Sequence, residues 1–152
     1  MTKEKRVCGT CTACCTVIAI PELSKRSNVT CKFVQDSRCS IYPCRPRCCS
    51  GFSCEWLDGR GTNSERPDIS GVVIQQNLIG QTGIEGVHMW EVHQCALSWP
   101  AAQRAQKEFI ARKIPVVLYP KIGGITILIP KGTMVFAGDM DQERRKIRYV
   151  FV

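Results

Sequence analysis

Eight of the eleven cysteines form one spaced series near the start of the chain. The series comprises Cys8, Cys11, Cys14, Cys15, Cys31, Cys39, Cys49 and Cys54. Thiolate sulfur binds zinc and iron, and a Cys-x-x-Cys turn brings two sulfurs to one ion while its backbone N–H groups point at them. A chain of 152 residues can bury an ordinary hydrophobic core, so it does not need cross-links to stay folded. The series therefore predicts a metal site.

The first four cysteines carry the most detailed pattern. Cys8, Cys11 and Cys14 repeat a gap of two residues, as do three consecutive ligands of bacterial ferredoxin-type clusters, whose fourth ligand comes from elsewhere in the chain. Cys15 follows Cys14 directly, and adjacent cysteines do not easily reach one small tetrahedral ion with relaxed geometry. We therefore expect Cys14 and Cys15 to serve different metal ions or different corners of a larger cluster.

The pattern leaves the metal open. All-sulfur ligation suits zinc and iron–sulfur clusters alike, so we expect either more than one zinc ion or an iron–sulfur cluster. The simpler alternatives are one structural zinc held by four cysteines, with the other thiols spare and buried, or a disulfide-bonded protein.

Composition and hydropathy indicate a soluble globular protein. With 44% hydrophobic residues, the chain suits one domain or two small ones. The first eight residues are charged with no apolar stretch behind them, so no secretion signal is expected, and no segment approaches the roughly 20 apolar residues of a membrane span. We expect a cytoplasmic protein, in which reduced thiols act as metal ligands or redox groups more readily than as structural disulfides.

The formal net charge of +8 counts every cysteine as a neutral thiol. If the eight series cysteines held two zinc ions, eight thiolates and two dications would add about −4 and leave roughly +4. Residues 1–58 carry nine Lys or Arg against five Asp or Glu, an excess that can offset thiolate charge and donate hydrogen bonds to sulfur. These basic residues are therefore expected beside the metal-bound thiolates, so metal ions are the expected partners of the chain and nucleic acid is a disfavoured one.

The chain divides by composition at Asp58. Residues 1–58 hold ten of the eleven cysteines and form the expected cysteine-rich metal-binding region. Residues 59–68 are polar and rich in turn-forming types, which indicates a loop. Residues 59–152 are expected to form an α+β region, either as a separate unit or as one compact domain with the first.

The second region has several strand patterns and one helix pattern. Residue types that suit half-buried strands fill the segments 71–76, 87–93, 115–119, 125–129 and 146–152. Glycines between the first two segments indicate a hairpin.

Pro100 can open a helix, with Ser98 near the cap position. The pattern then places Ala102, Ala105 and Phe109 on one side of that helix. We therefore predict an α+β fold in which a small cysteine-rich metal-bound part packs on a mixed α/β part with mainly antiparallel strands and one clear helix.

Short motifs stand between the cysteines in a fixed order. They are Ile20-Pro21-Glu22-Leu23, Ile41-Tyr42, Arg45-Pro46, Phe52 and Trp56-Leu57. Together with the Cys-x-x-Cys-x-x-Cys-Cys start, residues 8–57 resemble the YkgJ-type cysteine-cluster family, also described as a zinc- or iron-chelating CxxCxxCC domain. The resemblance implies bacterial metal binding by the eight series cysteines and leaves the metal and any reaction open. More weakly, Arg66-Pro67-Asp68 and residues 115–118 resemble the C-terminal extension of longer members.

Two further thiols stand inside the series. Cys44 and Cys48 have no general counterpart in the family pattern, and either is close enough in sequence to replace a ligand. Cys49 keeps the family's register relative to Cys54, so it is the expected ligand. Arg45 and Arg47, which flank these thiols, are candidates to stand near thiolates.

The other residues that could bind metal are expected to have no metal role and to be partly buried or surface residues. His88 and His93 are the two histidines, and a spacing of five places them on opposite faces of a regular strand, which argues against a shared ion. Cys95 is expected as a small buried hydrophobic residue.

Three functions remain open. The first is a metal-binding protein whose multi-cysteine centre is structural or handles metal, with the α+β region as a scaffold or a surface for a protein partner. The second is an iron–sulfur redox or modifying protein, in which Cys8, Cys11, Cys14 and a later cysteine hold the cluster. The third is a zinc-stabilised nucleic-acid-binding module, which requires an exposed basic face with stacking aromatic residues. No GxSxG, HExxH or phosphate-loop motif occurs, so no familiar hydrolase or nucleotide enzyme is indicated.

Overall fold

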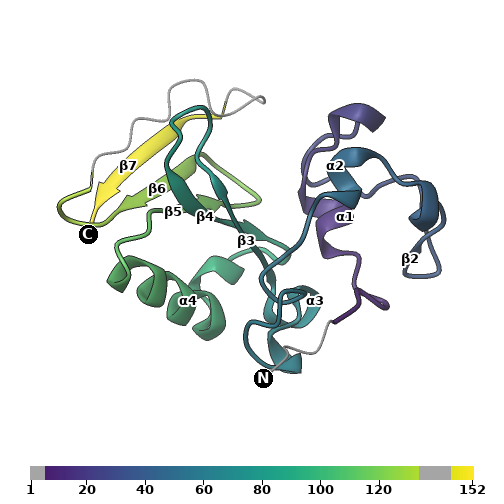
Figure 1. Ribbon diagram of the computed structural model, residues 1–152, viewed down its shortest axis with the longest axis horizontal. Coiled ribbons are helices and arrows are strands. Elements are labelled where there is room, and N and C mark those ends of the chain that lie inside the picture. Colours follow the sequence, from purple (N-terminus) through teal and green to yellow (C-terminus); the bar gives the residue numbers. More distant parts are fainter. Residues whose placement is uncertain (1–5, 134–144) are drawn as a thin grey trace.

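A computed structural model describes residues 6–133 and 145–152 of the chain. The charged start, residues 1–5, lies outside the described residues, and with it most of the segment on which we expect no secretion signal. The second region forms a five-stranded sheet with one long helix, and the cysteine-rich part lies beside this sheet (Figure 1). The predicted α+β class is confirmed.

Five strands form the sheet in the order β3-β4-β5-β6-β7. Their bounds are β3 Val72–Leu78, β4 Glu85–Glu91, β5 Val116–Tyr119, β6 Ile125–Ile129 and β7 Ile147–Phe151. All five predicted strands and the hairpin between β3 and β4 are confirmed. The β3–β4 and β5–β6 pairs are antiparallel, whereas β4–β5 and β6–β7 are parallel, so the sheet is mixed and the two kinds of pairing alternate across it.

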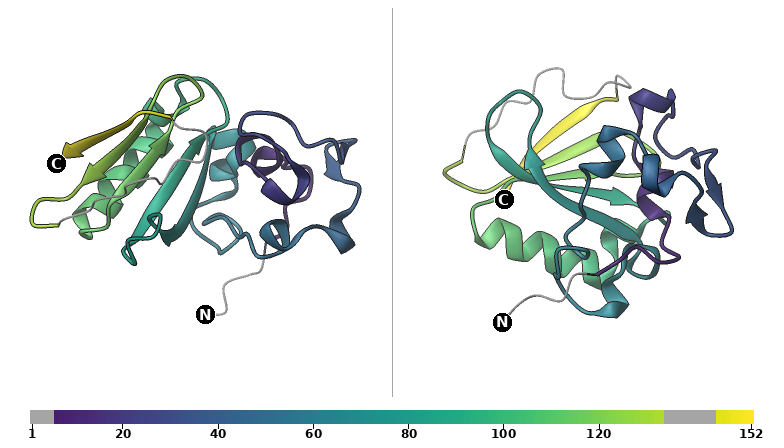
Figure 2. Two further views of the ribbon diagram at one scale, coloured as in Figure 1. Left: turned by 90° about the horizontal axis from the view of Figure 1, so that it is seen from above. Right: turned by 45° about the vertical axis from the view of Figure 1, so that its right-hand side comes forward.

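One face of the sheet is covered by α4 (Pro100–Ala111), as Figure 2 shows. Alternate residues of a strand point to opposite faces, so Met89 of β4 and Val116 of β5 share a buried cluster with Phe109 of the helix. α4 also makes the crossover between the parallel strands β4 and β5, a connection that parallel strands require. The predicted helix and its buried side are confirmed.

The start of α4 differs from the prediction in one detail. Trp99, not Ser98, is the N-cap residue, and no side chain caps the helix. The Ser98 hydroxyl donates to the Cys95 carbonyl at 2.7 Å instead, because Ser98 ends the short 3-10 turn η4 (Ala96–Ser98).

In the part of the chain that the structure describes, neither α4 nor any other helix is long and apolar enough to cross a membrane.

Two hydrophobic clusters cover the opposite face of the sheet. Toward β7, alternate isoleucines of β6 are buried among their neighbours. Toward the edge strand β3, Val73 packs with Ala13 and Val17 of the cysteine-rich part, and Trp90 lies against the same cluster. The two regions of the chain therefore share a hydrophobic cluster.

The cysteine-rich part consists of short elements joined by turns. They are α1 Ala13–Val17, η1 Pro21–Leu23, β1 Val34–Gln35, β2 Arg38–Cys39, η2 Tyr42–Cys44 and α2 Arg47–Ser50. Two of them, β1 and β2, form a small antiparallel hairpin. Helices of four or five residues are not stable alone, so this part depends on contacts between its turns and with the sheet.

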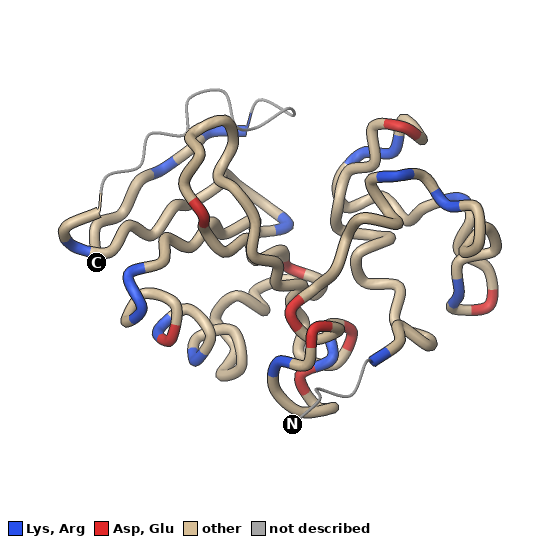
Figure 3. Tube along the Cα trace, in the orientation of Figure 1, with Lys and Arg blue, Asp and Glu red and all other residues tan. Residues whose placement is uncertain are grey.

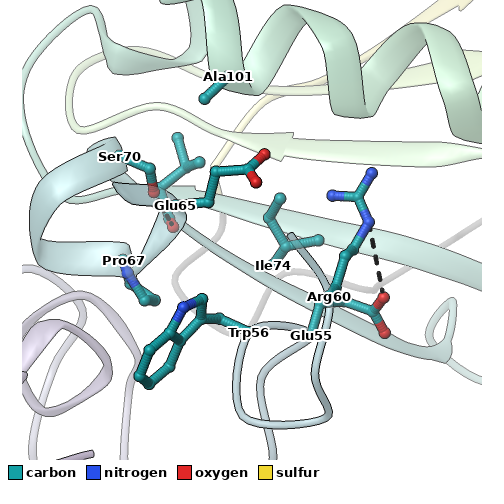
Figure 4. A pocket seen from close by; sticks show the side chains of 9 residues that line it. Glu55, Trp56, Arg60, Glu65, Pro67, Ser70, Ile74 and Ala101 are labelled. Atoms are coloured by element: carbon teal, nitrogen blue, oxygen red, sulfur yellow. Dashed lines mark hydrogen bonds and ion pairs between the residues drawn. The ribbon is translucent and has the colours of Figure 1, made fainter. Parts of the chain in front are cut away.

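Arg60 ties the two regions together beyond the shared cluster. Its guanidinium lies 3.9 Å from the Glu55 carboxylate, pairs with Glu108 of α4 and stands over the Phe109 ring at 4.8 Å. Figure 4 shows Arg60 in the wall of a small pocket beside α3 (Pro67–Ser70). This pocket of about 20 Å³ has room for roughly one water molecule, so it is a packing gap rather than a ligand site.

Gly71 links α3 to β3, and we expect its replacement to destabilise the fold. Its φ is +80°, and an added Cβ would stand 2.7 Å from Ala96 and from the Trp99 ring. Gly83 has a similar φ of +71° with nothing within 4 Å of its Cβ position. In urea unfolding we expect Gly83→Ala to cost about 1 kcal/mol for left-handed backbone and Gly71→Ala a further 1–3 kcal/mol, roughly, for the clash. Equal costs would contradict this packing.

Candidate metal centre

α1 holds the two adjacent cysteines at the middle of the cysteine-rich part. Ala13 and Val17 face the cluster shared with the sheet, which leaves the other sides of the helix to Cys14 and Cys15. Successive residues of an α-helix point about 100° apart, so the two sulfurs leave the helix in different directions. The Cys14 thiol nevertheless donates a hydrogen bond to the Cys15 sulfur.

Backbone contacts bring further cysteines to α1. The Cys11 N–H donates to the Cys8 carbonyl at 2.9 Å in the turn before the helix. The Cys31 N–H donates to the Cys15 carbonyl at 3.0 Å, which draws a segment 16 residues later in the chain to the same helix. Cys54 is buried in the cluster that α1 shares with the sheet.

One group of thiols gathers around Cys8. Burial raises the pKa of Cys8 and of Cys54, and it raises the pKa of Cys11 to about 11. The charge of Cys8 acts on the pKa of Cys11, Cys14 and Cys54, so all three lie within its electrostatic reach. The charge of Cys15 acts on Cys8 as well, so Cys8 lies near the other three cysteines of the motif and one later cysteine.

A second group of thiols gathers around Cys49 of α2. Burial raises the pKa of Cys49, and the charges of Cys15, Cys31 and Cys39 raise it further. Cys31 is buried and Cys39 is half-buried. The charge of Cys15 also acts on the pKa of Cys8, so Cys15 lies within electrostatic reach of both Cys8 and Cys49. That Cys14 and Cys15 serve different metal ions stays a prediction.

Lys25 is a buried cation beside these thiols. Lys25 is 9% exposed. Its ammonium donates to the carbonyls of Thr16, Ile18 and Arg26 at 2.9, 2.6 and 3.1 Å. Burial lowers the pKa of Lys25, while the charges of nearby thiolates, Cys31 and Cys15 foremost, oppose that shift. In the described part of the chain no carboxylate lies within ion-pair distance of Lys25.

Lys25 was not among the predicted site residues. A lysine followed by an arginine is ordinarily read as solvated surface. The chain instead turns back after η1 through Ser24, whose φ is +51°, and Lys25 forms an isolated bridge with Ile20. The turn carries the ammonium inward to the carbonyls around α1.

The second region also reaches the centre, through Asp68 of α3. Arg66 holds the Asp68 carboxylate with two hydrogen bonds of 2.7 Å. The Asp68 carboxylate accepts a hydrogen bond from the Cys11 thiol, and its backbone N–H donates to the Cys11 sulfur. Partial burial opposes ionisation of Asp68, but the Arg66 guanidinium and the Cys11 thiol hold its pKa below the ordinary value. The sequence shows Arg66-Pro67-Asp68 only as part of a weak resemblance.

The two flanking arginines and the two extra thiols occupy different surroundings. Arg45 stands over the Tyr42 ring at 3.8 Å, and its charge acts on Cys8, whereas the charge of Arg47 acts on Glu22. Cys44 and Cys48 are exposed, while Cys49 is half-buried. Cys49 rather than Cys48 therefore stands among the inner thiols.

The histidines stand apart from the cysteines. Burial lowers the pKa of His88, so its ring is neutral at pH 7. Its Nε2 lies 3.1 Å from the Leu78 carbonyl, which can only accept, so Nε2–H donates there and Nδ1 accepts from the Tyr119 hydroxyl at 2.9 Å. His93 stacks on Trp99 with ring centroids 5.7 Å apart. Each histidine thus has structural partners.

His88 also lines an open hollow of about 430 Å³ on the sheet, together with Trp90 and Tyr119. These three rings pack face to face on one another, with centroids 5.0 to 5.8 Å apart. None of the residues that line the hollow is charged or a cysteine.

The prediction for Cys95 is wrong: Cys95 is exposed, because it occupies a turn with φ +67° directly before η4.

All eleven cysteines are free thiols. Within residues 6–133 and 145–152, no three Cys, His, Asp or Glu side chains converge closely enough to hold an ion. The sulfurs of the cysteine-rich part therefore do not enclose a coordination sphere in this structure. Comparison of the chain with protein-family models, with curated proteins and with solved structures found no match.

Cys15 should be more acidic than Cys11 in metal-free, reduced protein. The hydrogen bond from Cys14 and the charge of Lys25 lower its pKa to about 7, and the thiolate is the form that reacts with iodoacetamide. We expect its alkylation rate, followed by peptide mass spectrometry, to rise with pH with a midpoint near 7, and Cys14→Ala to raise that midpoint. Cys11, with a pKa of about 11, serves as the internal comparison. A Cys15 midpoint as high as that of Cys11 would contradict the assigned hydrogen bond.

Proposed function

We propose that the chain is a cytoplasmic metal-binding protein with a multi-cysteine zinc or iron–sulfur centre. Its ligands come from Cys8, Cys11, Cys14, Cys15, Cys31, Cys39, Cys49 and Cys54. The resemblance of residues 8–57 to the YkgJ-type cysteine-cluster family supports a bacterial metal-chelating role. The surroundings of these thiols supply the physical argument.

Lys25 is the observation that carries the proposal. A buried ammonium is costly unless an opposite charge stands near it. The charges that act on Lys25 are those of Cys31, Cys15, Cys14 and Cys49. Cysteines bound to a metal stay deprotonated at neutral pH. Four thiolates around one dication therefore leave the centre with a net negative charge. An anionic metal–thiolate centre therefore accounts for the burial of this lysine.

The donor set fits the proposed metals. Eight cysteines are enough for two tetrahedral zinc sites, and Cys8, Cys11 and Cys14 have the spacing of three ligands of an iron–sulfur cluster. Bound zinc would cross-link the short elements of this part, whereas an iron–sulfur cluster would add one-electron chemistry. The chain's own residues hold the sulfurs in place, offset their charge through Lys25 and support Cys11 through Asp68.

A nucleic-acid role is not supported by the distribution of charge. Lys and Arg are spread over both regions and interspersed with Asp and Glu (Figure 3). A basic residue near the centre, Arg45, is engaged with Tyr42 and the Tyr42 carbonyl. We therefore infer that metal, rather than nucleic acid, is the ligand of the cysteine-rich part.

Metal analysis of protein purified without oxygen tests the proposal. Colourless protein with about two zinc ions per chain supports paired zinc sites, and brown protein with stoichiometric iron and sulfide supports an iron–sulfur cluster. Protein that contains neither metal above trace level, before and after anaerobic reconstitution, would contradict the proposal.

Lys25→Met keeps the length of the side chain and removes its charge. Because the ammonium offsets thiolate charge, we expect metal affinity to fall by roughly 10- to 100-fold, the range typical of groups that support ligands. The measurement is competition with a chelator of known affinity. Lys32→Met is the matched control, since Lys32 is exposed and stands over the Phe33 ring at 5.1 Å. Equal affinities in the two variants would sink the role assigned to Lys25.

Cys14→Ser and Cys15→Ser test the two adjacent thiols of α1 as ligands. Metal binding and folding are coupled in small metal-bound parts, so we expect each variant to lose metal and to melt at a lower temperature than wild type. Cys95→Ser, an exposed thiol outside the series, should leave both quantities unchanged. Wild-type metal content and melting temperature in both α1 variants would show that these thiols are not ligands.

A further inference from the structure

Glu22 of η1 holds the start of α2 across a long stretch of chain. One oxygen of its carboxylate accepts the backbone N–H of Cys48 at 2.9 Å, and the other accepts that of Arg47 at 3.3 Å. The contacts span 26 and 25 residues. Among the described residues Glu22 forms no ion pair. Its carboxylate is therefore engaged with the backbone of α2.

The helix that Glu22 contacts has no cap of its own. The first N–H groups of a helix lack partners inside the helix. Pro46 is the N-cap residue of α2, and no side chain at that position caps the helix. Glu22 supplies acceptors for two of these N–H groups from another part of the chain. A helix of four residues is not stable alone, so these contacts fix how α2 is set.

The setting of α2 selects which of two adjacent thiols faces the other cysteines. Cys48 and Cys49 occupy successive positions of the helix, and successive side chains point about 100° apart. Cys49 is half-buried, whereas the other three residues of α2 are exposed. A rotation of α2 about its axis would bring the Cys48 thiol inward and turn the Cys49 thiol out.

Glu22 is itself mounted on a hydrogen-bonded turn. The Ile20 N–H donates to the Lys25 carbonyl at 2.9 Å, and the Lys25 N–H donates to the Ile20 carbonyl at 3.1 Å. The Lys25 ammonium then donates to two carbonyls at the end of α1, at 2.9 and 2.6 Å. One turn thus connects α1, which carries the first pair of adjacent cysteines, with α2, which carries the second pair.

We propose that Glu22 is a positioning residue that makes Cys49, rather than Cys48, the metal ligand of α2. This inference rests on the metal-binding function proposed above. Glu22 acts through the backbone of α2, whose rotation its two hydrogen bonds fix. A carboxylate that only stabilised the fold would lower the melting temperature on removal and leave the identity of the ligand unchanged.

The test is alkylation of the full chain with N-ethylmaleimide after loading without oxygen with zinc, or with iron and sulfide if it takes up only these. Metal-bound thiolates are protected, and peptide mass spectrometry compares the labelling rates of Cys48 and Cys49. In wild type we expect Cys48 to react at least about tenfold faster than Cys49. Glu22→Ala should bring the two rates within about threefold of each other at unchanged metal content, because either thiol can then turn inward.

Two further variants serve as controls. Glu22→Gln keeps an oxygen within reach of the Cys48 N–H and should retain the preference for Cys49 as ligand. Glu65→Ala is the matched control, since the Glu65 carboxylate also accepts a backbone N–H, that of Thr62 at 2.8 Å, in a turn without cysteines. It should leave the wild-type labelling ratio unchanged. Far-UV circular dichroism checks that each variant is folded.

The outcomes separate this inference from the function on which it rests. Wild-type protein that takes up no zinc or iron overturns both. Loaded wild type without preferential labelling of Cys48, or Glu22→Ala with the wild-type ratio, overturns the positioning role alone. Loss of metal from folded Glu22→Ala also overturns it, because Cys48 would then be unable to replace Cys49.

The controls can contradict the inference as well. A ratio lowered equally in Glu65→Ala would show that any such carboxylate has this effect, and one lowered equally in Glu22→Gln would assign it to charge. If Glu22→Ala does not fold, Glu22→Asp takes its place, since it keeps the charge and shortens the reach. A wild-type ratio in Glu22→Asp then overturns the role of Glu22.

Discussion

The burial of Lys25 beside the thiols is the constraint around which the cysteine-rich part is arranged. An ammonium removed from water needs hydrogen-bond acceptors for its protons and a nearby negative charge to offset its own positive charge. Three carbonyls from the α1 end and the following turn supply the acceptors. In the proposed metal-bound centre, the thiolates of Cys31, Cys15, Cys14 and Cys49 would supply the charge. Three features bring the Lys25 ammonium close to the sulfurs: the turn at Ser24, the position of α1 and the return of the chain at Cys31.

The sheet stabilises this arrangement from outside. Short helices gain little stability from their own hydrogen bonds, so α1 depends on the packing of Val17 against Val73. Arg60 adds a link to α4 through Glu108 and Phe109, and Asp68 contacts Cys11 directly. The α+β region is thus more than a neighbour of the cysteines, because one of its side chains touches a candidate ligand.

Much of the second region could be predicted from the sequence, because strand and helix periodicity are local properties. The alternation of Ile125, Ile127 and Ile129 and the single-sided pattern of α4 required no knowledge of the rest of the fold. The cap at Trp99 and the exposure of Cys95 were missed, because a turn with positive φ at Cys95 redirects the chain there. Lys25 and Asp68 were missed for a different reason: their roles arise from tertiary contacts with cysteines 6 to 57 residues away in the chain. The assignment of Cys14 and Cys15 to different metal ions follows from their adjacency in the sequence and stays a prediction.

X-ray absorption spectroscopy at the edge of the bound metal tests the central claim most directly. The spectrum reports the elements that surround the metal and their distances. An all-cysteine centre predicts sulfur neighbours only, at about 2.3 Å if the metal is zinc. A first coordination shell that contains nitrogen or oxygen at about 2.0–2.2 Å would contradict the assignment of eight sulfur ligands.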